Sequence, residues 1–146
     1  YQNGRAPVFT VNLQYPTGFS KLIPFDAATI PGSQLVQFLT RESSKPFTST
    51  RNDGEDVWTA VCTSDLANRI LAESTLSAEQ HLQQVSEVVE EELFRILQPY
   101  STSRPMKMKA KRWGSAFCSV SLGLKEDCIT LAPWRLSIAG DFIRKS

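Results

Sequence analysis

Residues 77–99 constrain the fold more than any other part of the sequence. Ser77 and Gln80 form the Ser-x-x-Gln pattern of a capping box, and Pro99 marks the end of the segment. Between these limits we predict an amphipathic helix of about five turns, with four nearby glutamates on its solvated face. Its apolar stripe must be buried against another layer of structure, and consists of Leu82, Val85, Val89, Leu93 and Ile96.

Strand-like segments surround this helix in the sequence. Runs of β-branched and aromatic residues predict strands at 8–15, 34–40, 57–63 and 106–113, with shorter ones at 116–122, 128–131 and 134–139. The strand at 57–63 is mostly apolar, so we expect it to be central. Ser64 and Asp65 offer a cap for a short helix that runs to about Glu73. The sequence thus predicts an α+β fold: a mixed, largely antiparallel sheet with one long and one short helix packed on one face.

The strand at 106–113 alternates in polarity. Met106, Met108 and Ala110 fall on one side, while three lysines and Trp113 fall on the other, as in a strand with one solvated face. Alternating lysines beside a tryptophan can also bind nucleic acid. Lysine is, however, a normal residue on an edge strand, and the net charge of +1 attracts no polyanion. We expect no nucleic-acid partner.

Composition and motifs exclude several classes of protein. The 146 residues suit one ordinary domain, and no apolar run is long enough to span a membrane. Glycine-rich nucleotide motifs and a nucleophile elbow are missing, and His81 alone is a weak candidate base. Cys62, Cys118 and Cys128 lie in apolar stretches, so we expect buried thiols, a reducing intracellular compartment and no metal site.

The C-terminal apolar strand leads into Gly140 and Asp141. Glycine lets a backbone approach a ligand closely, and an aspartate at the end of a strand can face a ligand hydroxyl or phosphate. The same Gly-Asp pair is also common in turns.

Six segments, taken in order, resemble successive blocks of the renalase-like family of FAD-dependent amine-oxidase-type oxidoreductases. They are VFTVNLQYP, LIPFDAATI, ESSKP, VWTAVCTS, KRWGSAF and WRLSIAGDF, and together they span nearly the whole chain. The resemblance implies an enzyme of two lobes. Residues 1–135 would be the substrate-binding domain and residues 136–146 the start of the C-terminal FAD-contacting segment, whereas the Rossmann dinucleotide domain lies outside this chain.

The same resemblance implies the site. Gly140 and Asp141 would lie against the FAD pyrophosphate and ribityl chain with Phe142 beside them, and Trp113 would wall the pocket over the isoalloxazine. No side chain would be catalytic, because the flavin would accept hydride from a small amine or a reduced nicotinamide-type substrate. Joined to its nucleotide domain the lobe would be active, and the isolated chain inactive.

An alternative remains open: a non-catalytic scaffold or interaction subunit derived from this lobe, working in a larger assembly. The missing nucleotide motif fits this alternative directly. Many relatives also follow the tryptophan with a bulky polar pair, where this chain has Gly114 and Ser115. Because the chain begins with Tyr1, we expect it to be a piece of a longer protein. A Gly-x-Gly-x-x-Gly motif upstream would favour the enzyme.

Overall fold

The computed structural model describes residues 5–45, 56–118, 128–131, 133 and 135–139. The chain divides into two compact units, residues 8–113 and residues 1–7 with 114–146. The described elements are β1 (Arg5–Tyr15), η1 (Phe19–Lys21), β2 (Ala27–Thr29), β3 (Val36–Arg41), η2 (Glu42–Ser44), β4 (Asp56–Cys62), α1 (Ser64–Ala72), α2 (Ala78–Leu97), β5 (Lys107–Cys118), β6 (Cys128–Leu131) and β7 (Leu136–Ala139).

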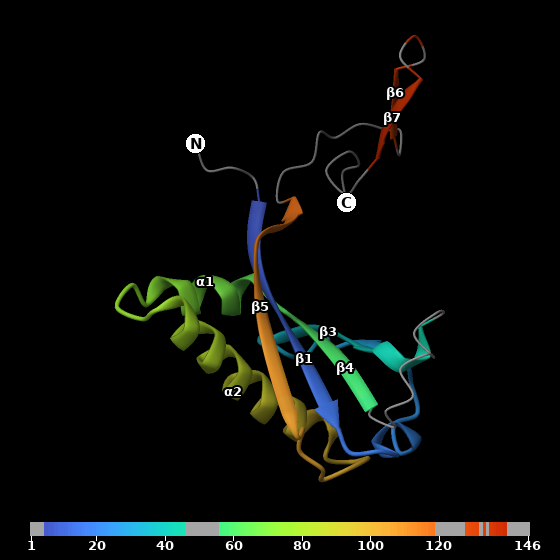
Figure 1. Cartoon of the computed structure of the whole chain (residues 1–146), viewed down its shortest axis with the longest axis vertical. Coiled ribbons are helices and arrows are strands. Elements are labelled where there is room, and N and C mark those ends of the chain that lie inside the picture. The colour runs from blue at the N-terminus through green and yellow to red at the C-terminus, as the bar shows by residue number, and fades with distance from the viewer. Residues whose placement is uncertain (1–4, 46–55, 119–127, 132, 134, 140–146) are drawn as a thin grey trace. The chain divides into compact units, whose positions relative to one another are not determined.

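Five strands form one sheet in the order β2-β3-β4-β1-β5. The pairs β1/β4, β3/β4 and β2/β3 are antiparallel, and β5 runs against β1 along the sheet edge (Figure 1). Strands β4 and β5 therefore point the same way on either side of β1, and the two helices connect them. The predicted α+β fold, with one long and one short helix on one face, is confirmed, and β4 is the central strand.

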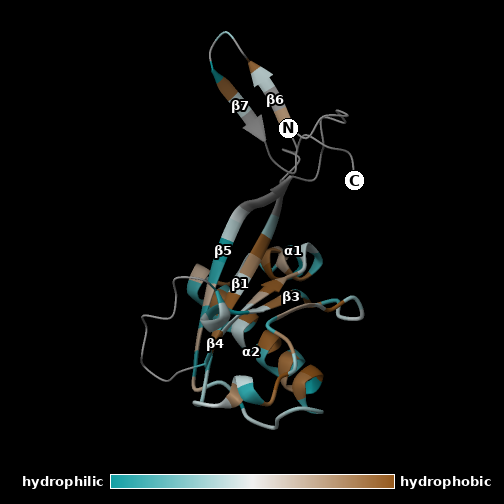
Figure 2. Cartoon of the chain, turned by 90° about the vertical axis from the view of Figure 1, so that its right-hand side faces the viewer, coloured by the Kyte–Doolittle hydropathy of each residue, from teal (hydrophilic) through white to brown (hydrophobic). Residues whose placement is uncertain are grey.

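The core lies between the two helices and one face of the sheet. In β1 and β4 alternate residues point inward, and their register places Leu13 opposite Trp58 and Val11 opposite Ala60. The stripe of α2 packs on this face, and Val85, Val89 and Leu93 have no exposed surface. In Figure 2 hydrophobic colour accordingly gathers on β1 and the helices. Helix α1 adds Leu66, Ala67 and Ile70.

Trp58 organises the end of the core near the turn after β1. Its indole Nε1 donates to the Ser20 hydroxyl at 3.1 Å, and the backbone N–H of Ser20 donates to buried Asp56 at 2.9 Å. The rings of Phe19 and Phe25 meet Trp58 edge-on. The buried polar groups at this end thus have partners, which the burial of a tryptophan and a carboxylate requires.

The helix boundaries follow their caps. Ser77 and Gln80 form the predicted capping box of α2. For α1 the cap is Thr63, one residue before the predicted Ser64, and its hydroxyl accepts from the Leu66 N–H at 3.2 Å. Sequence reasoning missed β2, because three residues are too few to give a periodic signal. The strands predicted at 106–113 and 116–122 are one continuous strand from 107 to 118, and residues 119–122 lie outside the described part.

The second unit contains the antiparallel hairpin of β6 and β7, with Cys128 opposite Ala139. This matches the strands predicted at 128–131 and 134–139 within two residues. Cys128 is exposed, which corrects the expectation of a buried thiol at this position. Cys62 is buried on β4 as expected, and burial raises its pKa to about 12. Among the described helices none is both long and apolar enough to cross a membrane.

Replacing Leu93 with alanine should lower the free energy of unfolding by about 3 kcal/mol, because it leaves a cavity between α2 and the sheet. Urea denaturation followed by circular dichroism measures the change. The control is Gln83→Ala, an exposed position on the same helix, which should cost less than about 0.5 kcal/mol. Equal losses in the two variants would contradict the packing described above.

Candidate functional site

The two faces of the sheet carry different side chains. The inner face is apolar and covered by α1 and α2, whereas on the opposite side β1, β4 and β5 present mainly polar residues. We call that side the outer face, and its strand positions alternate with the core residues. It consists of Thr10, Asn12 and Gln14 of β1, Val57, Thr59 and Val61 of β4, and Lys107, Lys109, Lys111 and Trp113 of β5.

Trp113 lies on the outer face in a fixed position. Its indole Nε1 donates to the hydroxyl of Thr10 on the neighbouring strand at 3.0 Å. The ammonium of Lys111 lies over the ring, 4.1 Å from the centroid. Even so, 44% of the residue remains exposed. The arrangement is a flat aromatic surface, held by a hydrogen bond at its edge and accessible to a ligand.

A hollow of about 380 Å³ opens on the same face, toward the start of β5. The Asn12 carbonyl oxygen accepts from the Thr59 hydroxyl at 3.0 Å, which leaves the amide N–H groups of Asn12 as donors. Lys107 and Lys109 are exposed at its rim and form no ion pair with any residue that the structure describes. Its lining is Asn12, Leu13, Gln14, Val57, Lys107, Met108 and Lys109.

The structure places one of the four site residues predicted from the sequence. Trp113 lies on the outer face of the sheet, and its place beside a flavin stays a prediction. Gly140, Asp141 and Phe142 lie outside the described residues, so their proposed contacts with a cofactor stay predictions. That Trp113 shares a site with them likewise stays a prediction.

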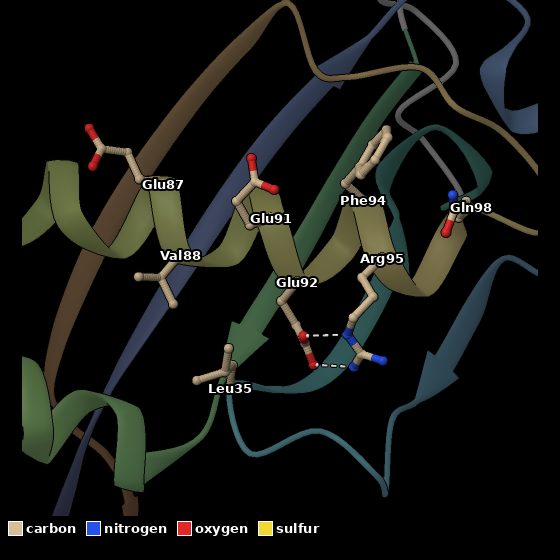
Figure 3. Close-up of a pocket in the computed structure, with 8 residues that line it drawn as sticks. All are labelled: Leu35, Glu87, Val88, Glu91, Glu92, Phe94, Arg95 and Gln98. Carbon is tan, nitrogen blue, oxygen red and sulfur yellow. Dashed lines mark hydrogen bonds and ion pairs between the residues drawn. The ribbon is translucent and has the colours of Figure 1, made fainter.

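A second, larger hollow of about 680 Å³ lies beside α2 (Figure 3). Val88, Glu92 and Arg95 point toward Leu35, while Glu87, Glu91 and Phe94 project from the other side of the helix. The Glu92 carboxylate accepts from the Arg95 guanidinium at 3.0 and 3.1 Å and from the Ser33 hydroxyl at 2.6 Å. These contacts tie α2 to the loop before β3.

Three glutamates in the second half of α2 form ion pairs with arginines. Arg104 bonds both Glu90 and Glu91, and its guanidinium lies 4.2 Å from the centroid of the Phe94 ring. The hydrogen bond from Arg104 lowers the pKa of Glu91, and the one from Arg95 lowers the pKa of Glu92. Carboxylates held in the ionised form by arginines do not act as general acids at neutral pH. The charged residues that line this hollow therefore have a structural role.

His81 also has a structural role. Its Nε2 lies 3.0 Å from the carbonyl oxygen of Glu73, which can only accept, so that nitrogen carries the proton. The contact links the end of α1 to the start of α2. No group of three or more His, Cys, Asp or Glu residues in the described part of the chain is arranged to hold a metal ion.

Sequence reasoning missed the partners of Trp113 and the hollow. Alternation along 106–113 showed that the lysines and Trp113 share one side of a strand, but not which strand lies next to it. Thr10 is 103 residues away from Trp113 in the sequence, and Asn12 is 97 residues away from Lys109. Only the return of β5 to pair with β1 brings them together.

No model of a protein family matches the chain, and no curated protein is significantly similar to it.

Replacing Thr10 with valine removes the acceptor of the Trp113 indole while keeping the side-chain shape. The Trp113 indole N–H resonance should shift toward its value in water, and the free energy of unfolding should fall by about 1 kcal/mol or less. Trp58, bonded to Ser20, is an internal reference whose resonance should stay in place. An unmoved Trp113 resonance in a ¹H–¹⁵N spectrum would refute the hydrogen bond.

Replacing Glu92 with glutamine should flatten the dependence of stability on pH. The pKa of Glu92 is lowered in the folded state, so its contribution is present above the unfolded pKa of about 4.3 and is lost as pH falls through the folded value. Urea unfolding at neutral and acid pH measures the difference. Arg95→Gln should flatten the profile similarly, and the double variant should add little. Additive effects would mean that the two side chains act independently.

Proposed function

We propose that this chain is the substrate-binding portion of an FAD-dependent oxidoreductase of the renalase-like, amine-oxidase type. In this proposal the outer face of the sheet forms one wall of the flavin and substrate pocket. The helices on the inner face hold the sheet in shape, and the nucleotide-binding domain is supplied by sequence outside this chain.

The observation that supports the proposal most strongly is the state of Trp113. Trp113 is 44% exposed as a residue and its indole N–H is held by Thr10, so its planar ring is suited to pack against another planar ring such as an isoalloxazine. The ammonium of Lys111 lies over one face of the ring, so in this proposal the flavin packs against the opposite face. The residue therefore fits the place that the sequence resemblance implies for it.

The chemistry of the outer face also fits. When bound, a flavin accepts hydride from the substrate, so the protein needs no acid, base or nucleophile of its own. The outer-face positions of β1, β4 and β5 defined above include no carboxylate, histidine or cysteine. Their work would be to orient the substrate and to keep water from it, with Thr10 fixing the angle of the Trp113 ring.

Flavin binding tests the proposal directly. Protein made from the complete reading frame should carry FAD, seen as visible flavin absorbance after purification. Trp113→Ala should lower the affinity for FAD or slow flavin reduction by substrate roughly tenfold, since a stacked aromatic contributes on the order of 1 kcal/mol or more. Trp113→Phe should restore most of the loss because it retains a flat ring.

Tyr100→Ala is the matched control. Tyr100 is also 44% exposed, but it follows α2 and packs on Phe25, so its loss should leave flavin binding unchanged. A complete protein that is colourless and does not bind added FAD would reject the oxidoreductase function and favour the non-catalytic scaffold.

A further inference from the structure

We propose that the hollow on the outer face near the start of β5 is an anion-binding subsite, which takes a phosphate or carboxylate group of a ligand. The proposal rests on the proposed function only in regarding that ligand as a substrate. The binding of the anion itself follows from the charges and donors that line the hollow.

Charge is the first argument. Lys107 and Lys109 lie at the rim about 6.6 Å apart along the strand, and no aspartate or glutamate is among the lining residues. Three glutamates of α2 are instead paired with arginines, Glu92 with Arg95 and both Glu90 and Glu91 with Arg104. Both ammonium groups therefore lack a carboxylate partner in the described part of the chain, and a bound anion would neutralise their charge.

Hydrogen-bond direction is the second argument. The amide N–H groups of Asn12 bond no described residue, because the one hydrogen bond of its side chain is at the carbonyl oxygen, so they are donors available to the hollow. The lysine ammonium groups are donors only. A site rich in donors selects a ligand group rich in acceptors, which phosphates and carboxylates are.

Shape is the third argument. Val57 adds an apolar side chain beside the polar rim, and the volume of about 380 Å³ holds more than a single small ion. Trp113 lies about 13 Å further along the strand than Lys109, at four residues of strand rise. An extended ligand could place an anionic group in the hollow and a planar group near Trp113. A simple cationic amine does not suit this surface.

Calorimetric titration of the complete protein with sodium tripolyphosphate and with citrate tests the subsite and separates phosphate from carboxylate ligands. We expect binding of at least one probe, weakened roughly tenfold by Lys107→Gln and again by Lys109→Gln. Lys21→Gln is the control, since Lys21 is an exposed lysine in η1 and its replacement should leave the affinity unchanged. Equal affinity in all variants, or no binding of either probe, would overturn the proposal.

Two further outcomes are distinguishable. If long single-stranded nucleic acid binds but tripolyphosphate and citrate do not, the lysines are an extended polyanion surface and the small-anion subsite is rejected. Flavin absorbance is recorded on the same samples. Protein that contains flavin but binds neither probe refutes the subsite alone, whereas colourless protein that binds a probe refutes the flavin function and keeps the subsite.

Discussion

Burial of the α2 stripe against β1 and β4 is the interaction on which the rest of the structure depends. Val89 and Leu93 are fully buried, and they meet strand residues such as Leu13 that are equally inaccessible. Full burial of an aliphatic side chain contributes roughly 1.5–3 kcal/mol, so a few such residues supply much of the stability of a small domain. The helix is secured at its start by a capping box and beside β3 by the contact between Glu92 and Ser33.

Packing the helices on one face leaves the other face free for binding. Side chains alternate along a strand, so the buried residues Val11 and Leu13 of β1 have polar neighbours that point the opposite way. Once the apolar residues of β1 and β5 are packed on the inner face, Thr10, Asn12 and Trp113 must therefore lie on the outer face. This division lets the inner face set stability while the outer face accommodates a ligand, which is the arrangement that the proposed pocket wall needs.

The charges are divided between the same two sides. Glutamates of α2 are paired with Arg95 and Arg104, and hydrogen bonds from these arginines lower the pKa values of Glu91 and Glu92. The lysines of β5 have no carboxylate partner among the described residues. A net charge of +1 thus conceals a local excess of positive charge on the outer face, and local charge rather than the total decides what a surface attracts.

Sequence by itself determined the long helix with its cap, most of the strands and the α+β class, because these follow from local periodicity and capping chemistry. It also placed Trp113 and the lysines on one side of their strand. Tertiary structure alone decided the strand order, which puts β5 next to β1 and brings Thr10 to Trp113 and Asn12 to the lysines. The physical reason is that strand pairing joins residues about a hundred positions apart, and no local pattern specifies which edge a returning strand will choose.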